Sequence, residues 1–245
     1  MKKVILFFLV IFFCSHYAYS DNLYWFSAAG IKKPSAKIVD LYNKTHTDKV
    51  VLIAGGTGQI LSQMIISKKG DIYTPIDSKF LDTAVKKNVI IDYVKIMKLT
   101  PVFGVCKEKG NLIKTFNDLA KKGVRIAVGN PKTMSLGKTS RYILSRLPNN
   151  IRHKIKNNVV VSAINISQIV NYVKTGSVDT GILFDAVAKT NDIDYIKIPE
   201  KYNQIKYGYV ALVKFSKNKK RAKELFNFIL SHKYIYKQYG FSMVK

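Results

Sequence analysis

The chain has 245 residues, of which 47% are hydrophobic, and a formal net charge of +26. This length and apolar fraction are sufficient for one or two domains with a sizeable core. The lysines are scattered along the chain, with no arginine-rich arm and no ladder of aromatic and basic residues. We therefore do not expect nucleic-acid binding, whereas a basic surface favours anionic ligands or an anionic membrane surface.

The first 20 residues predict an export signal. Lys2 and Lys3 form a basic start, residues 4–13 form an apolar run, and residues 18–20 form a site with small residues for cleavage after Ser20. The apolar run is too short to span a membrane. We expect a periplasmic protein whose mature chain keeps 39 basic and 15 acidic residues, because cleavage removes two of the 41 basic residues.

The cysteines agree with export. Cys14 lies in the signal, so Cys106 is the single cysteine of the mature chain and no disulfide can form within it. Lipid anchoring at Cys14 is the alternative. It is less favoured because the bulky Phe12 and Phe13 precede that cysteine.

Short apolar or β-branched runs predict strands along the whole mature chain. In chain order they are residues 24–26, 49–54, 71–76, 100–106, 124–128, 159–162, 179–184 and 207–213.

Apolar residues at helical spacing follow most of these strands, over residues 58–68, 135–147 and 166–173 and near the C-terminus at 222–229. Ser78 is expected to cap a helix that turns Leu81, Ala84 and Val85 inward. Thr115 with Asp118 predicts a capping box. The alternation of strands and helices predicts an α/β fold with mostly parallel sheets and helices on both faces.

Four loops between strands and helices are candidates for ligand binding, because ligands of open α/β sheets bind where strand ends meet helix starts. Each presents free backbone N–H groups at a helix start, where the helix dipole favours an anion. The loops are residues 28–31, 55–58, 134–137 and 163–166. Glycine-rich turns are also ordinary connections, so no single loop decides a function.

Catalytic and metal-binding patterns are lacking in the sequence. His46, His153 and His232 lie far apart without metal-ligand spacing, and no G-x-S-x-G motif occurs. The "GGTG" segment lacks the Gly-Lys-Ser/Thr of a phosphate-binding Walker loop. We expect neither a catalytic site nor a metal site.

Five segments, in the right order over nearly the whole mature chain, resemble the periplasmic molybdate-binding proteins of ABC transporters. "FSAAGIKK" is similar to the opening "FAAAS" of that family, "IAGGTGQILSQM" to its "GGSG" segment, and "GNPKTMSLGK" to its "GDPxxxPAG" loop. "NISQIVNYVKTGSVDTGILF" is similar to its "NVxxALxxVxxGxADAGIVY" run, and "YKQYGF" to its usual close.

The resemblance implies a type II periplasmic binding protein with two lobes and a ligand cleft between them. Lobe I would comprise residues 21–98 and 207–245, and lobe II residues 99–206. The protein would be a monomer without a cofactor that catalyses nothing. It would capture molybdate, tungstate or a similar tetrahedral oxyanion and deliver it to a membrane permease.

The family's ligand positions fall on residues that differ partly from its pattern. Gly30, followed by Ile31, stands where the family has a serine, and Phe184 where it has a tyrosine, so two hydroxyls are missing. Thr57 keeps a hydroxyl. Leu136 and Ile166 stand at positions that bind through backbone N–H groups.

Three charged residues beside these positions could compensate for the lost hydroxyls. Lys32 and Lys33 are possible partners of the anion, although both could equally be solvated residues of a first helical turn. Asp185 could pair with one of them, or contact the metal centre of a tungstate ion.

The bound ligand stays open between molybdate or tungstate and another anion, such as sulfate, phosphate or a small organic acid. A sensor domain without transport is a further alternative. An enzyme on this fold would have only Asp185 and Lys32 as candidates for its chemistry.

Overall fold

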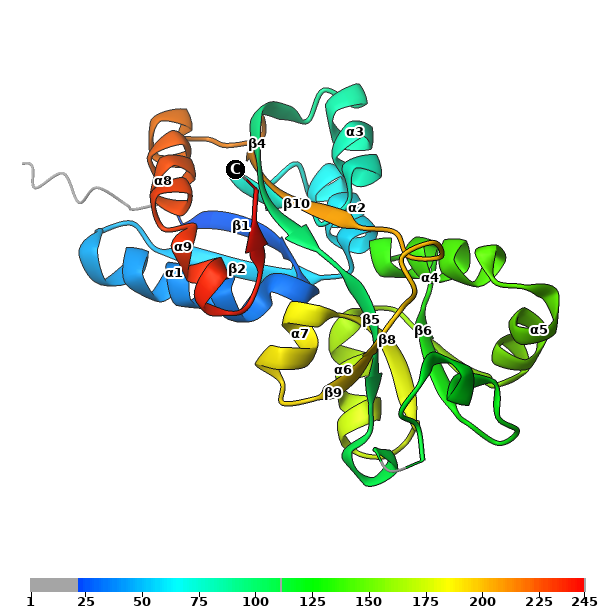
Figure 1. Ribbon diagram of the computed structural model, residues 1–245. Coiled ribbons are helices and arrows are strands. Elements are labelled where there is room, and N and C mark those ends of the chain that lie inside the picture. Colours follow the sequence, from blue (N-terminus) through cyan, green and yellow to red (C-terminus); the bar gives the residue numbers. More distant parts are fainter. Residues whose placement is uncertain (1–21, 111, 245) are drawn as a thin grey trace, which may run out of the picture.

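The computed structural model describes residues 22–110 and 112–244. The predicted export signal, its cleavage site and Cys14 lie outside the described residues. The described strands form two separate sheets (Figure 1). We call each sheet with its helices a lobe.

Lobe I contains a six-stranded sheet in the order β11-β4-β10-β3-β1-β2. Its strands are β1 (Leu23–Ala28), β2 (Val50–Gly55), β3 (Ile72–Thr74), β4 (Ile90–Leu99), β10 (Lys206–Val213) and β11 (Ser242–Met243). Lobe II contains a five-stranded sheet in the order β7-β6-β8-β5-β9. Its strands are β5 (Pro101–Val105), β6 (Ile126–Gly129), β7 (Val159–Ala163), β8 (Thr180–Phe184) and β9 (Asp194–Lys197).

Each sheet has a parallel part and an antiparallel part. Strand β1 pairs in parallel with β2 and β3, and β6 pairs in parallel with β7 and β8. Antiparallel pairing enters with β4, β10 and β5, which flank the crossings between the lobes. The predicted fold class, a two-lobed α/β protein with mixed sheets, is confirmed.

Helices cover both faces of each sheet (Figure 1). In lobe I they are α1 (Lys32–Thr45), α2 (Thr57–Ser67), α3 (Ser78–Lys86), α8 (Lys219–Ser231) and α9 (Tyr234–Gln238). In lobe II they are α4 (Ser135–Arg146), α5 (Asn149–Asn157), α6 (Ile166–Lys174) and α7 (Asp185–Thr190). Short 3₁₀ helices add η1 (Ala29–Ile31), η2 (Lys107–Lys109) and η3 (Phe116–Ala120).

The burial pattern explains why the apolar spacing forms these helices. On α8 the buried side chains are Ala222, Leu225, Phe226 and Ile229, which share one helical face as the spacing predicted. Helix α1 is fixed by a buried chain of hydroxyls, because Ser35 Oγ lies 3.0 Å from Ser27 Oγ and 3.3 Å from Tyr236 Oη. This chain holds the start of α1 against the end of β1.

The polypeptide passes between the lobes at Thr100 and again before β10. Asp185 fixes the first crossing, because its N–H donates to the Thr100 carbonyl over 2.9 Å and its carboxylate accepts from the Thr100 N–H over 3.4 Å. The strands change from one sheet to the other close to the predicted lobe boundaries. The exact boundaries stay a prediction.

Local predictions around two caps need correction. Helix α3 is capped by Asp77, whose carboxylate accepts from the N–H of Lys79, and Ser78 is already helical. Val85 is exposed, and Phe80 instead joins Leu81 and Ala84 in the core, so the buried face of the helix differs by one position from the predicted one. The Thr115 capping box exists, but it starts a 3₁₀ helix.

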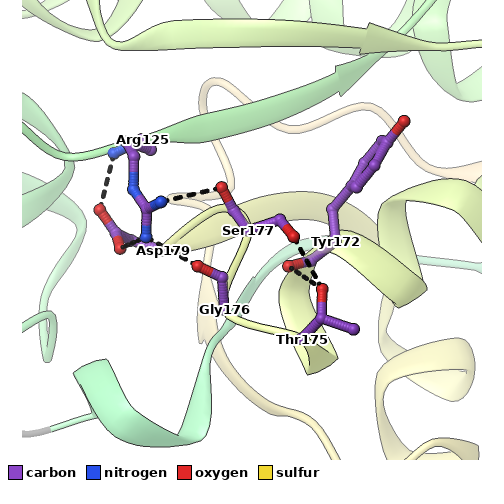
Figure 2. A network of polar contacts seen from close by, with 6 residues as sticks. All are labelled: Arg125, Tyr172, Thr175, Gly176, Ser177 and Asp179. Atoms are coloured by element: carbon purple, nitrogen blue, oxygen red, sulfur yellow. Dashed lines mark hydrogen bonds and ion pairs between the residues drawn. The ribbon is translucent and has the colours of Figure 1, made fainter.

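An ion pair closes the far end of the lobe II sheet (Figure 2). Arg125, just before β6, lies 2.7 Å from the carboxylate of Asp179 and also donates to the carbonyls of Gly176 and Ser177. Burial opposes ionisation of Asp179, but the hydrogen bonds from Arg125 outweigh it, so the pKa of this carboxyl is lowered. The pair ties the start of β6 to the turn before β8.

Within the described part of the chain, no helix has the length and apolar character needed to cross a bilayer.

Candidate functional site

The carboxyl ends of the parallel strands of both lobes meet at one place. In lobe I the last residues of β1 and β2, Ala28 and Gly55, are paired neighbours. In lobe II the last residues of β6 and β7, Gly129 and Ala163, are also paired. The loops that follow these four strands therefore face one another across the cleft between the lobes, as expected for ligand sites of α/β sheets.

A small cavity lies where these loops meet. Its volume is about 10 Å³, roughly the room of one water-sized atom. It is lined by the ends of β1, β2 and β8, by η1, by the starts of α2, α4 and α6, and by one residue before α3. The lining residues are Ala28, Ala29, Gly30, Gly55, Gly56, Thr57, Ile76, Met134, Ser135, Leu136, Ile166 and Phe184.

The structure brings five of the six predicted ligand residues to this cavity: Gly30, Thr57, Leu136, Ile166 and Phe184. Ile31 does not line it, because η1 turns its side chain into the core, where it is fully buried. The sequence did not indicate Ile76, which lies in the loop between β3 and α3. Its position beside Gly30 depends on the sheet order, which places β3 next to β1.

Backbone donors face the cavity from both lobes. Thr57, Leu136 and Ile166 stand in the first turns of α2, α4 and α6, where N–H groups have no partner within the helix. Within the described residues, no protein acceptor is bonded to these three N–H groups. Three helix starts with free donors create a region of positive potential that suits an anion.

Thr57 also offers a side-chain hydroxyl. The residue is only 2% exposed, and its hydroxyl has no hydrogen bond to the described part of the protein. Its position is fixed from behind by Tyr73, whose hydroxyl donates to the Thr57 carbonyl over 3.1 Å. Burial raises the pKa of Tyr73 well above its usual value, which keeps this donor protonated. Tyr73 is a positioning residue that sequence reasoning missed.

The two lobes touch directly beside the cavity. The N–H of Gly58 in α2 donates to the carbonyl of Thr133 in lobe II over 3.0 Å. A Cβ atom on Gly56 would lie 2.8 Å from the carbonyl oxygens of both Thr133 and Ile164. Glycine at position 56 is therefore required for this closeness, because any side chain would collide with lobe II backbone.

A buried ion pair joins the same region to the strand that re-enters lobe I. The Lys206 ammonium at the start of β10 lies 3.2 Å from the carboxylate of Asp77, and the Ser135 hydroxyl of α4 donates to that carboxylate over 2.7 Å. Asp77 and Lys206 are 1% and 7% exposed. Three segments, from lobe I, lobe II and the crossing strand, thus share one carboxylate.

The two lysines next to Gly30 have different surroundings. The Lys33 ammonium donates to the Thr190 carbonyl and to the Asn191 side-chain oxygen, each over 2.8 Å. It thereby binds the carboxyl end of α7 in lobe II, a favourable place for a cation. Partial burial and the nearby Lys174 lower the pKa of Lys33. Lys32 is exposed, and its ammonium has no polar contact with the described residues.

The structure does not bring Asp185 to either lysine. Its polar contacts are with Thr100 and with the N–H of Ala186 in its own helix, and it is not among the residues that line the cavity. Its position supports the crossing between the lobes. Across residues 22–110 and 112–244, no group of metal-liganding side chains occurs.

Comparison with known proteins agrees with this geometry. Residues 23–242 match the family of bacterial extracellular solute-binding proteins. The chain belongs to this family. Its members are binding proteins, so we describe the chain as a solute-binding protein and not as an enzyme.

Relatives and solved structures are similar over most of this solute-binding protein. A Haemophilus influenzae protein, named as a binding protein, is 28% identical over 212 residues, which are 86% of this chain and 85% of its own. The structure of the periplasmic molybdate-binding protein of Azotobacter vinelandii is 17% identical with a TM-score of 0.80, covering 91% of this chain and 100% of that one.

A third likeness is to a structure of PEB3 with bound L-phospholactate. It is 18% identical with a TM-score of 0.73, and covers 90% of this chain and 99% of the other. The names of the two solved structures give different ligands. The shared fold therefore does not identify the ligand of this solute-binding protein, which depends on its own residues.

Proposed function

We propose that this solute-binding protein captures a small tetrahedral oxyanion between its lobes and delivers it to the permease of an ABC transporter. Molybdate and tungstate are the first candidates, and sulfate, phosphate or a small organic acid are the alternatives. We expect the exported protein to work as a periplasmic monomer.

One observation carries the proposal. The first turns of α2, α4 and α6 converge on a single cavity between the lobes, and the N–H groups of Thr57, Leu136 and Ile166 have no acceptor among the described residues. Neutral donors on preorganised helix starts bind an anion without any partner of opposite charge. Because the donors come from both lobes, an anion held by them also favours contact between the lobes.

The side chains agree with a site of low polarity. Gly30 and Phe184 contribute no hydroxyl, and Ile76, Leu136 and Ile166 surround the donors with apolar atoms. The lining contains no carboxylate that would repel an anion. Hydrogen bonds are stronger in such surroundings than in water, which offsets part of the loss of two hydroxyls relative to the molybdate-binding pattern.

The test is a ligand screen on the mature protein. Anions are added at up to millimolar concentration, and the melting temperature is followed, because a ligand that binds only the folded state raises it. Molybdate or tungstate should raise the melting temperature in a saturable manner. If only sulfate or phosphate raises the melting temperature, molybdate is not the ligand but the site still binds an oxyanion. If no anion raises it, the proposal is wrong.

A further inference from the structure

A larger cavity adjoins the small one and shares three of its residues. Its volume is about 150 Å³, and it has Ala29, Gly30 and Ile166 in common with the small cavity, which we now call the inner cavity. Its other walls come from the first turn of α1 in lobe I and from α6 and α7 in lobe II. We call it the outer groove. It lies between the lobes, as does the inner cavity.

Gly30 is the shared wall of the two cavities. A Cβ atom at this position would lie 3.3 Å from Ile76 Cδ1 and 3.6 Å from Ile166 Cγ2. A longer side chain here would therefore lie between the inner cavity and the outer groove. At this point the glycine adds no side chain of its own to those of Ile76 and Ile166.

The outer groove combines an apolar floor with a polar rim. Val170, Val187 and Phe241 are buried and form part of the floor. Lys32, Ser167 and Asn171 are exposed on the rim.

The side chains of Lys32, Ser167 and Asn171 form no hydrogen bond with the described residues. The neighbouring Lys33 is already occupied by Thr190 and Asn191. Lys32 is thus the cation of this groove that is free to meet a ligand.

The sizes of the two cavities favour a ligand that occupies both. The inner cavity holds roughly one water-sized atom, which is less than a central atom with all its oxygens. An oxyanion bound to the donors of α2, α4 and α6 therefore extends toward Gly30. On the same measure the outer groove is about 15 times larger, from 150 Å³ against 10 Å³.

We propose that the ligand of this cleft is an organic oxyanion, with a tetrahedral head at the inner cavity and a short polar chain in the outer groove beside Lys32. Carbon atoms of the chain pack on Val170 and Val187, and a carboxylate or hydroxyl at its end meets Lys32, Ser167 and Asn171. This inference rests on the proposed function and names the class of anion that the same site prefers.

Matched pairs of ligands test the inference. Phosphate is compared with phosphoglycolate, and sulfate with sulfoacetate, by calorimetry at constant ionic strength. Each pair shares a head and differs by a short carboxylated chain. In at least one pair the organic member should bind 10-fold or more tightly than the bare anion. Bare anions that bind as tightly as their organic partners in both pairs would overturn the inference.

The outcomes also separate this inference from the proposed function. If molybdate or tungstate binds and neither organic anion does, the oxyanion site stands and the organic ligand is rejected. If none of the anions binds, the proposed function itself is rejected.

Two variants locate the chain of the ligand. Asn171→Trp fills the outer groove, and Lys32→Gln removes its free cation. Both should lower the affinity for the organic member by at least 10-fold and reduce its advantage over the bare anion. Lys37→Gln, an exposed site on α1 outside both cavities, is the control and should bind as wild type does. If Lys32→Gln still binds the organic member more tightly than the bare anion by the wild-type factor, the placement of the chain is wrong. Should Asn171→Trp not fold, Lys32→Gln alone provides the test.

Discussion

At the scale of single residues, Thr57 is the side chain on which the proposed anion site depends most. The residue is almost fully buried, and its hydroxyl has no hydrogen bond to the described protein and stands at the start of α2 beside the free donors. A hydrogen bond to a charged group contributes about 1.5–3 kcal/mol. A threonine in this position is well suited to donate to an anion.

Thr57→Val should therefore weaken anion binding by about 10- to 100-fold, because valine keeps the shape and removes the donor. Calorimetry with whichever anion raises the melting temperature measures the effect. Thr57→Ser, which retains the hydroxyl, should stay within about threefold of wild type. Equal affinities of Thr57→Val and wild type would move the site away from this turn.

Asp179 illustrates a residue that serves stability rather than binding. Its pKa is lowered in the folded state because the hydrogen bonds from Arg125 outweigh the effect of burial. A carboxyl with a depressed folded pKa adds stability above its unfolded pKa of about 3.9, and loses that contribution as the pH falls through the folded pKa.

Asp179→Asn should lower the free energy of unfolding by about 1–3 kcal/mol at pH 7, since it breaks a charge-assisted contact. The difference from wild type should shrink as the pH falls below about 4, because the unfolded carboxyl is protonated there first and the folded carboxyl only at its lowered pKa. Urea denaturation at both pH values measures this. Glu200→Gln, at an exposed position, should change little. A difference that is constant with pH would show that packing, not charge, explains the loss.

At the scale of elements, the start of α2 sets how closely the lobes approach. Gly58 donates to Thr133 across the cleft, and Gly56 lies against two carbonyls of lobe II. The contact uses backbone atoms on both sides, so it cannot adjust by a change of rotamer. Lys33 adds a further contact between the lobes, from α1 to the end of α7.

Gly56→Ala should hold the lobes apart, because its Cβ would meet the carbonyl oxygens of Thr133 and Ile164 at 2.8 Å. Overpacking of this kind costs about 1–3 kcal/mol, so anion affinity should fall by about 10- to 100-fold. Calorimetry gives the affinity, and small-angle scattering should show a more extended liganded state.

Gly110→Ala is the matched control for this prediction. Its added Cβ would meet only the Lys107 carbonyl, at an ordinary 3.5 Å, far in sequence from the cleft loops. It should bind as wild type does. If Gly56→Ala also binds as wild type does, closure at this turn is not part of capture.

At the scale of the whole molecule, the sequence predicted the elements that contain a continuous apolar run or an apolar helical face. Strands β1 and β2 and helix α8 follow their apolar patterns. Strand β4 was missed, because Asp92, Lys95 and Lys98 interrupt its apolar residues at every third position, which is neither a continuous apolar run nor the alternation of a strand. Its pairing with the apolar β10 is a long-range effect.

The candidate site divides in the same way. The strand-to-helix loops are local features, so Gly30, Thr57, Leu136 and Ile166 could be found from sequence and resemblance. Contacts between lobes are not local: nothing near Lys33 in the sequence indicates Thr190, and nothing near Asp77 indicates Ser135 or Lys206. The different roles of Lys32 and Lys33 depend on the placement of α7.

A crystal structure of the mature protein with tungstate tests the central claim most directly, because the anomalous scattering of tungsten marks the position of the anion. We predict one strong peak between the lobes, beside Gly30 and within hydrogen-bond reach, through its oxygens, of the N–H groups of Thr57, Leu136 and Ile166. Peaks confined to surface lysines, with none at this position, would contradict an oxyanion site in the cleft.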